Sequence, residues 1–230
     1  MADLGILTKR LNHQFSDEGL LDEALSHRSS GSHNYERLEF LGDSFLNFVI
    51  ASELFRQRSD EDEGALSRLR ASLVRQSTLA DIARELNLGD YLKLGVGELR
   101  SGGFRRDSIL SDVVESIIGA VLLDAGHDTA RELVLRLYGD RIEKLPPSAE
   151  LKDPKTRLQE LLQGRSYARP EYEVIEAVGK SHDMRFTVAC TLPELSMKVR
   201  ATATSRRKAE QAAAALMLED LQQQLNAHSE

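Results

Sequence analysis

The stretch Glu36-Arg-Leu-Glu-Phe-Leu-Gly-Asp-Ser-Phe-Leu-Asn47 places acidic and apolar residues at helical spacing. At about 100° per residue, Glu36, Glu39 and Asp43 fall within about 60° of one another around a helix. The opposite side collects four apolar residues, Leu38, Leu41, Phe45 and Val49. The stretch therefore predicts an amphipathic helix with one carboxylate edge and one core face.

A second acidic helix is predicted from Ser108-Ile-Leu-Ser-Asp-Val-Val-Glu-Ser-Ile-Ile-Gly119. Asp112 and Glu115 are three residues apart and share a face. Ser108 and Gly119 lie on that face too, and their small size allows another helix to approach closely. The opposite side is apolar and carries Leu110, Val113, Val114, Ile117 and Val121.

Two interpretations of these carboxylates are open from spacing alone. The first is a pair of ordinary solvated helix faces. Against it, no Lys or Arg lies four residues after any of these acids, so the like charges on each face are not compensated within the helix. The second is a site for Mg²⁺, which prefers oxygen ligands and can assist phosphodiester hydrolysis.

Composition narrows the class of protein. The chain has 230 residues, with 41% hydrophobic and 29% charged residues, which is typical of a globular protein. A single cysteine, Cys190, excludes an internal disulfide framework and a cysteine zinc site. The longest apolar run, Ile117 to Leu123, is far shorter than the roughly 18–20 residues of a membrane span, and the N-terminal residues do not resemble a signal peptide. We therefore expect a cytoplasmic protein that is not inserted in a membrane.

The chain is predicted to divide at Pro146 and Pro147, which cannot continue a helix. We expect an all-α domain at 1–145, a linker at 146–153, an α+β domain at 154–224 and a tail at 225–230. In the first domain helical periodicity is found at Tyr35–Phe55, Ala65–Leu86, Ser108–Leu123 and Thr129–Ile142.

In the second domain, apolar and polar residues alternate along three segments, as is typical of β-strands. A helix at Thr156–Gln163 precedes strands at Tyr172–Ala177, Arg185–Leu192 and Met197–Thr204, and Ser205 caps an Ala-rich helix that extends to about Gln222. The order α-β-β-β-α predicts three antiparallel strands with both helices on one face. Residues 1–146 hold 18 basic and 25 acidic residues, whereas residues 147–230 hold 12 of each, so the acidity lies in the first domain.

Glu36-Arg-Leu-Glu-Phe-Leu-Gly-Asp-Ser44 resembles the signature motif of the ribonuclease III family, and Gly102 to Asp124 is similar to the second conserved block of that family. The resemblance continues through the C-terminal domain, which is similar to a double-stranded RNA-binding domain. It implies an all-α endonuclease domain followed by that RNA-binding domain. It also implies a homodimeric, divalent-metal-dependent endoribonuclease that cuts double-stranded RNA, leaves 5′-phosphate and 3′-hydroxyl ends, and processes ribosomal and messenger RNA.

The family's site residues map onto this sequence without a departure at the central positions. The implied metal ligands are Glu39, Asp43, Asp112 and Glu115, with Asp43 and Glu115 as the catalytic pair. Glu36 and Glu63 match accessory acidic positions. The implied cofactor is Mg²⁺, for which Mn²⁺ can substitute, and it would activate water for attack on the phosphodiester bond. The segment 93–103 is expected to form a loop near this site, and His27 receives no role because the histidines lack metal-ligand spacing.

For the RNA-binding domain, the resemblance implies that double-stranded RNA is contacted from three places. These are the first helix, the loop that joins the first two strands, and the start of the last helix. The residues concerned are Thr156, Gln159, Gln163, Lys180, His182, Arg206, Arg207 and Lys208. Cations in the first turn of a helix oppose its dipole unless a phosphate binds there, which supports a role for the last three.

Two predictions have alternatives, namely the function of the acidic domain and the location of the apolar residues of its signature helix. The acidic domain can instead serve only for dimerisation in a noncatalytic binder of duplex RNA, although an inert relative is expected to have lost a carboxylate. A metal-dependent hydrolase of another phosphodiester is a third interpretation, which the attached RNA domain argues against. The apolar residues of the signature helix, such as Phe40 and Phe48, can support a dimer or fill the monomer core. No small-molecule cofactor is expected.

Overall fold

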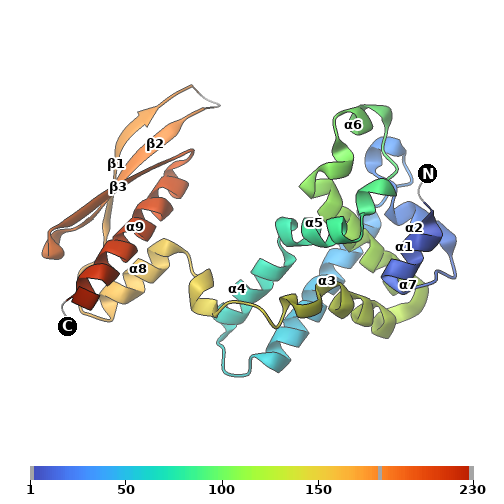
Figure 1. The fold of residues 1–230 in the computed structure, drawn as a ribbon, viewed down its shortest axis with the longest axis horizontal. Coiled ribbons are helices and arrows are strands. Elements are labelled where there is room, and N and C mark those ends of the chain that lie inside the picture. Colours follow the sequence, from blue (N-terminus) through green and yellow to red (C-terminus); the bar gives the residue numbers. More distant parts are fainter. Residues whose placement is uncertain (1–2, 181–182, 228–230) are drawn as a thin grey trace. The chain divides into compact units, whose positions relative to one another are not determined.

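A computed structural model describes residues 3–180 and 183–227 and separates into two compact units, Met1–Ser148 and Ala149–Glu230 (Figure 1). The division falls between Ser148 and Ala149, and a short 3₁₀ turn at Ser148–Leu151 follows the two prolines. Within the described residues, no helix is both long and apolar enough to cross a membrane.

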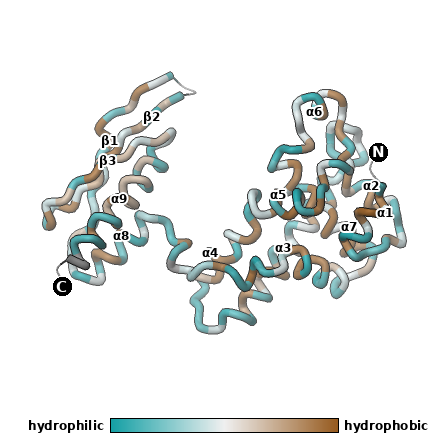
Figure 2. Tube along the Cα trace, in the orientation of Figure 1, coloured by the Kyte–Doolittle hydropathy of each residue, from teal (hydrophilic) through white to brown (hydrophobic). Residues whose placement is uncertain are grey.

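The regular elements of the first unit, within the described residues, are all helices, as predicted, apart from an isolated β-bridge between Ser26 and Lys93. Its α-helices are α1 (Leu4–Leu11), α2 (Glu18–Ala24), α3 (Glu36–Gln57), α4 (Glu63–Val74), α5 (Gln76–Glu85), α6 (Val96–Arg100) and α7 (Asp107–Tyr138). In Figure 2 hydrophobic and hydrophilic segments alternate along these helices, as expected where each helix buries one face.

Three details differ from the sequence prediction. The segment 65–86 is two helices, because Arg75 between them has an extended backbone with φ −66° and ψ 149°. The two helices predicted around residues 108–142 form α7, which is interrupted at Gly126 by a non-helical backbone with φ 79°. The segment 93–103 is not wholly a loop, since it contains α6, which is too short to show periodicity.

The core of the first unit is built around α3 and α7, which pack along each other. The predicted core residues Leu38, Phe45 and Val49 of α3 are buried, whereas Leu41 is half-buried. The predicted core positions of α7 are all buried, namely Leu110, Val113, Val114, Ile117 and Val121. This packing leaves the carboxylate edge of each helix at the side of the shared interface.

The second unit has the predicted α-β-β-β-α order. It comprises α8 (Pro154–Gln163), β1 (Glu171–Val178), β2 (Arg185–Leu192), β3 (Met197–Ala203) and α9 (Arg206–Ala227). The strands form an antiparallel sheet in the order β1-β2-β3, with a register shift between Val174 and Glu176. Both helices lie on the same face of the sheet (Figure 1) and enclose a core that includes Leu158, Cys190 and Met217.

Candidate active site and RNA-binding surface

The acidic site depends on a close crossing of α3 and α7 at two glycines. A Cβ atom built on Gly42 would lie 1.8 Å from the carbonyl oxygen of Glu115, and one on Gly119 would lie 2.2 Å from the carbonyl oxygen of Leu38. Both distances are far below van der Waals contact, so no larger residue fits without separating the helices. The glycines therefore set the distance between the two acidic helix edges.

Three of the predicted metal ligands come together at this crossing. One carboxylate oxygen each of Glu39, Asp112 and Glu115 lies within 4.8 Å of the other two. All three side chains are half-buried. Such a set of hard oxygen donors, shielded from water and without a cation among them, fits a divalent cation such as Mg²⁺.

The electrostatics of this cluster differ from those of a solvated helix face. Burial, together with the neighbouring carboxylates Asp112, Glu36 and Asp43, raises the pKa of Glu39 to about 7. Burial and the charges of Asp43, Asp112 and Glu39 raise the pKa of Glu115 to about 8. Without a cation, therefore, the cluster cannot be fully ionised at neutral pH, and a bound cation would remove this penalty.

Asp112 is fixed by two hydroxyl groups. The Tyr35 hydroxyl donates to Oδ2 of Asp112 at 3.4 Å, and Ser111 Oγ lies 3.3 Å from Oδ1 while it shares its proton with the nearer Ser108 carbonyl at 2.8 Å. Burial raises the pKa of Asp112, while the two hydrogen bonds act in the opposite direction. Tyr35 itself is buried and immediately precedes α3, so it links the start of that helix to the ligand from α7.

The other predicted acidic residues lie around this group or away from it. Asp43 is exposed one turn after Glu39, and its Oδ1 accepts a hydrogen bond from Asn47 Nδ2 at 2.8 Å. Its oxygens are not in the three-residue group, although its charge raises the pKa of Glu39 and Glu115. Glu36 is exposed beside Arg28, and Glu63 begins α4, where its Oε1 accepts from Ser67 Oγ at 2.8 Å.

A hollow of about 650 Å³ opens beside the carboxylates and contains residues that the sequence did not identify. Its acidic side is Glu36, Glu39 and Asp112, and its other residues include His27, Arg28, Ser29, Glu98, Arg106 and Ser108. The expectation that the segment 93–103 lies near the site is confirmed through Glu98. His27 was assigned no role, and Arg28 and Arg106 were not singled out, because they lie in two short connections between helices that carry no periodic pattern.

In the second unit the predicted RNA-binding residues of α8 lie toward solvent. Asp153 caps this helix by accepting the Thr156 amide at 3.1 Å, and the Thr156 hydroxyl donates to the same carboxylate at 2.7 Å. Gln163 is exposed and Gln159 is half-exposed one turn earlier. Two amide side chains on successive turns can reach the 2′-hydroxyls of one minor groove.

The basic cluster at the start of α9 is only partly neutralised. Arg206 Nε donates to Glu210 at 2.8 Å, and Glu210 also pairs with Lys155 at 2.6 Å. Arg207 and Lys208 are exposed and form no ion pair with any residue that the structure describes. The unpaired charges of Arg207 and Lys208 therefore oppose the helix dipole more than that of Arg206, which already has an acidic partner.

The β1–β2 connection presents Lys180 in a tight turn. Gly179 has φ 119°, and a Cβ there would lie 2.2 Å from the carbonyl oxygen of Asp183, so this turn requires glycine. The Asp183 amide donates to the Lys180 carbonyl at 2.7 Å, and the Lys180 side chain is exposed. His182 lies outside the described residues.

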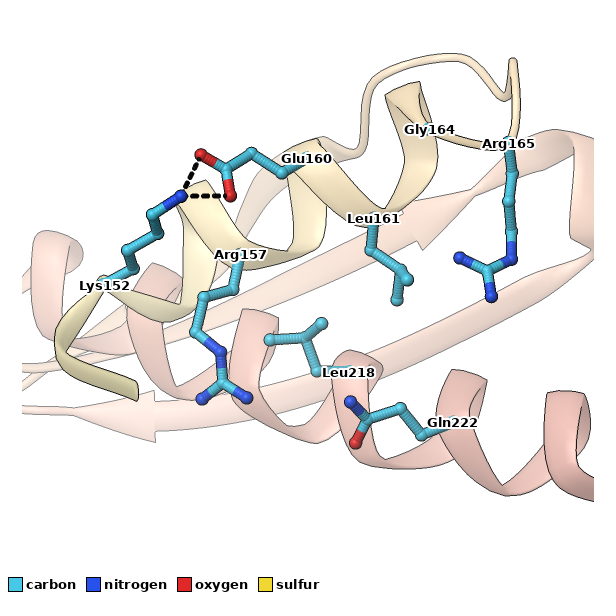
Figure 3. Close-up of a pocket in the computed structure, with 8 residues that line it drawn as sticks. All are labelled: Lys152, Arg157, Glu160, Leu161, Gly164, Arg165, Leu218 and Gln222. Atoms are coloured by element: carbon cyan, nitrogen blue, oxygen red, sulfur yellow. Dashed lines mark hydrogen bonds and ion pairs between the residues drawn. The ribbon is translucent and has the colours of Figure 1, made fainter. Parts of the chain in front are cut away.

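A hollow of about 400 Å³ between α8 and α9 contains none of the predicted RNA-binding residues (Figure 3). In it, Lys152 is paired with Glu160, and Leu161 and Leu218 form an apolar floor near Arg157 and Arg165. At about 100° per residue, Arg157 and Leu161 lie on nearly the opposite side of α8 from Gln159 and Gln163. The predicted RNA-binding residues of α8 therefore face away from this hollow.

Comparison with known families now decides the class of protein. The family model described as Ribonuclease-III-like matches residues 17–142, and the model described as double-stranded RNA binding motif matches residues 154–221. The first match contains all the carboxylates of the site, and together the two cover most of the chain.

The chain belongs to the ribonuclease III family.

Individual members of the family are similar in sequence to this ribonuclease III chain over nearly its full length. A protein named Ribonuclease 3 from Vibrio cholerae is 56% identical over 94% of this chain and 96% of its own length. One of the same name from Bordetella pertussis is 53% identical over 95% of this chain and 86% of its own length. The ribonuclease III assignment therefore rests on both domains.

A solved structure supports the fold of the ribonuclease III nuclease domain. The nuclease domain of ribonuclease III from Campylobacter jejuni, whose description names a region involved in dimer formation, superposes with a TM-score of 0.60 and is 43% identical. It covers 62% of this chain and 100% of its own length. The protein is thus an endoribonuclease of the ribonuclease III family with a double-stranded RNA-binding domain.

Proposed function

We propose that this ribonuclease hydrolyses phosphodiester bonds of double-stranded RNA in a Mg²⁺-dependent reaction that leaves 5′-phosphate and 3′-hydroxyl ends. The observation that carries the proposal is the group of three half-buried carboxylates within 4.8 Å, which has no cation of the protein among its members. The proposed cellular role is processing of ribosomal and messenger RNA in the cytoplasm. Mn²⁺, another cation that accepts oxygen ligands, is expected to substitute for Mg²⁺.

In this proposal Glu39, Asp112 and Glu115 hold the cation, and Asp43 completes the set from the exposed edge of α3. When bound, the cation supplies Lewis-acid chemistry, which lowers the pKa of water and stabilises charge on the leaving 3′-oxygen. Tyr35 keeps the Asp112 carboxylate oriented through its hydroxyl. Glu36 and Glu63 are assigned accessory roles.

Duplex RNA is assigned to the second unit through the helix α8, the β1–β2 turn and the start of α9. Thr156, Gln159 and Gln163 contact one minor groove, Lys180 and His182 contact the next, and Arg206, Arg207 and Lys208 contact the phosphates between them. Domains of this kind span about 16 bp in this way. The exposure of Gln163, Lys180, Arg207 and Lys208 supports the assignment.

The proposed assembly is a homodimer formed through α3. Phe40 is 77% exposed and Phe48 is 58% exposed, which is unusual for aromatic residues in the core helix of a domain. A hollow of about 630 Å³ beside Phe40 is lined by Leu20, Leu38, Leu41 and Leu123 among others. An exposed aromatic ring next to an apolar hollow on the same surface is suited to a two-fold interface, in which each copy fills the hollow of the other. Phe45 and Leu46 instead fill the monomer core.

The direct test incubates the protein with a labelled RNA duplex of about 35 bp, roughly twice the span of one RNA-binding domain. Parallel reactions contain Mg²⁺, Mn²⁺, Ca²⁺ or EDTA. Cleavage in Mg²⁺ to products with 5′-phosphate ends is the expected result. Tight binding without cleavage in either Mg²⁺ or Mn²⁺ would refute the proposed chemistry.

A further inference from the structure

The hollow beside the carboxylates has a second wall that can donate hydrogen bonds. His27 is only 7% exposed and lines this hollow. Its Nδ1 accepts the backbone amide of Ser29 at 3.1 Å and lies 2.7 Å from Ser29 Oγ. Because a backbone amide can only donate, the ring proton is on Nε2. Nε2 has no hydrogen-bond partner among the described residues and is not enclosed, so a largely buried side chain keeps an oriented and accessible donor for a ligand.

Two arginines flank this histidine with unused donors. Arg28 lies 3.6 Å from Glu36, which is a loose ion pair, and its side chain is largely exposed. Arg106 Nη1 lies 2.8 Å from Glu98, while Nη2 reaches Ser101 Oγ only at 3.4 Å. Each guanidinium has five N–H groups, so both keep donors free to bind an anion.

An RNA strand needs such a wall because the carboxylates repel it. A phosphodiester that approaches Glu39 and Asp112 meets like charge in a partly desolvated site, where repulsion is stronger than in water. Guanidinium groups form bidentate hydrogen bonds with phosphate oxygens, and their positive charge offsets that repulsion. The acidic and basic walls face the same hollow, so one bound strand can meet both.

We propose that His27, Arg28 and Arg106 form a subsite for a backbone phosphate of the RNA strand, next to the bond that is cut. The inference rests on the proposed nuclease function, because the carboxylate wall defines where the strand is cut. Arg28 and Arg106 leave their present partners, Glu36 and Glu98, or share them with the phosphate. His27 Nε2 donates to a non-bridging oxygen, and Ser29 holds the ring in that orientation.

The experiment measures RNA affinity separately from cleavage. Binding of a duplex of about 35 bp is measured in Ca²⁺ over a series of salt concentrations, and single-turnover cleavage is measured in Mg²⁺. The variants are Arg28→Ala, Arg106→Ala, His27→Phe and His27→Gln, with Arg100→Ala as the control, since Arg100 is exposed on α6 and does not line the hollow. Mn²⁺-induced shifts in Tm report whether each variant retains the cation site.

Each arginine variant is expected to weaken RNA binding about tenfold. It should also reduce the salt slope, which is the slope of the logarithm of the binding constant against the logarithm of the salt concentration, by about one, as loss of one phosphate contact does. His27→Phe should lower single-turnover cleavage at subsaturating RNA about tenfold, and His27→Gln, which restores a donor near Nε2, should recover most of it. Arg100→Ala should behave as the wild type.

The subsite would be refuted if all three positions left RNA affinity and salt slope unchanged, or if they reduced cleavage only by losing the Mn²⁺-induced shift in Tm. The latter result would mean that the arginines merely balance the charges of the cluster. Failure of the proposed function looks different, because the wild type would then not cleave in Mg²⁺. The binding series in Ca²⁺ would still decide whether the basic wall contacts RNA.

Discussion

At the scale of single residues, the site is defined by carboxylates that the fold keeps partly out of water. Glu39 and Glu115 have pKa values of about 7 and about 8 because burial and neighbouring charges disfavour their ionised forms. The sequence predicted which acids share a face, but it could not predict their burial, which depends on the partner helix. It also could not identify His27, whose Nε2 is left without a partner among the described residues by the fold of residues 27–29.

The raised pKa values predict how stability depends on pH. Between about pH 4.5 and about pH 8 the folded state binds more protons at Glu39 and Glu115 than the unfolded chain does. These groups therefore make the cation-free protein less stable as pH rises through this window. Mg²⁺ competes with the protons, so the increase in Tm that it causes should grow from about pH 6 to about pH 8.5. An increase that is independent of pH would contradict this prediction.

Replacing the Glu115 carboxylate should raise the stability of the cation-free protein and weaken its binding of Mg²⁺. Glu115→Gln removes a charge from the cluster, so in EDTA near pH 8.5 its Tm should exceed that of the wild type by roughly 2–4 °C, corresponding to about 1 kcal/mol. The same variant should lose most of the Tm increase caused by Mg²⁺. Glu132→Gln, at an exposed position of α7, serves as the control and should change neither value. A lower Tm for Glu115→Gln in EDTA would show that charge repulsion in the cluster does not limit the stability of the cation-free protein.

At the scale of elements, the central feature is the crossing of α3 and α7 at Gly42 and Gly119. Helical periodicity was sufficient to predict both helices and their core faces, because those depend on local spacing. The contact between Gly42 and the backbone of Glu115 is not local, and only the small size of Gly119 hinted at a close approach. The breaks at Arg75 and Gly126 were likewise outside the reach of periodicity, since a single backbone conformation interrupts each pattern.

The crossing predicts a specific effect of adding one methyl group. Gly42→Ala places a Cβ 1.8 Å from the Glu115 carbonyl oxygen, so the helices must move apart. The expected result is a loss of roughly 1–3 kcal/mol of stability, measured by urea denaturation, and a weaker Mg²⁺-induced shift in Tm. Gly97→Ala is the matched control, because Gly97 is in the helix α6 and a Cβ added there would meet nothing within 4 Å. Equal behaviour of the two variants would refute the role of the crossing.

At the scale of the whole molecule, the nuclease unit is acidic and the RNA-binding unit has no net charge. The net charge of −7 belongs to the first part of the chain, while the basic residues that can reach phosphates lie at the start of α9 and around the hollow of the first unit. Composition and pattern were enough to predict the helical class of the first unit and the α-β-β-β-α order of the second, whereas the separate helices α4 and α5 and the helix α6 were not predicted. The proposed dimer contacts were not predictable in the same way. Helical periodicity places Phe45 on the core face of α3 and Phe40 outside it, and Phe45 is indeed buried while Phe40 is exposed, but periodicity does not indicate whether an exposed ring meets a second copy.

The RNA-binding surface predicts a change in salt dependence. Arg207→Ala combined with Lys208→Ala should weaken duplex binding about tenfold or more and lower the salt slope by about two, since each residue is proposed to contact one phosphate. Arg169→Ala, an exposed arginine outside the predicted surface, is the control. If the double variant kept the salt slope of the wild type, the phosphate role of these residues would be wrong.

Phe40, one of three exposed aromatic residues of α3, tests the proposed assembly state. Phe40→Asp places a charge in the proposed interface and should convert a dimer of twice 25.7 kDa into a monomer in sedimentation equilibrium at micromolar concentration. Val96→Ser, at a similarly exposed apolar position of α6, should remain dimeric. A monomeric wild type would contradict the proposed dimer.

The central claim is that the carboxylate cluster cuts duplex RNA while the second unit holds it. The most direct measurement compares the wild type and Glu115→Gln on the same labelled RNA duplex, with cleavage measured in Mg²⁺ and binding measured in Ca²⁺. We predict that the variant binds RNA with the affinity of the wild type and that its cleavage falls by about 10³-fold or more, as loss of a principal electrostatic group does. Cleavage by Glu115→Gln at nearly the rate of the wild type would contradict the account.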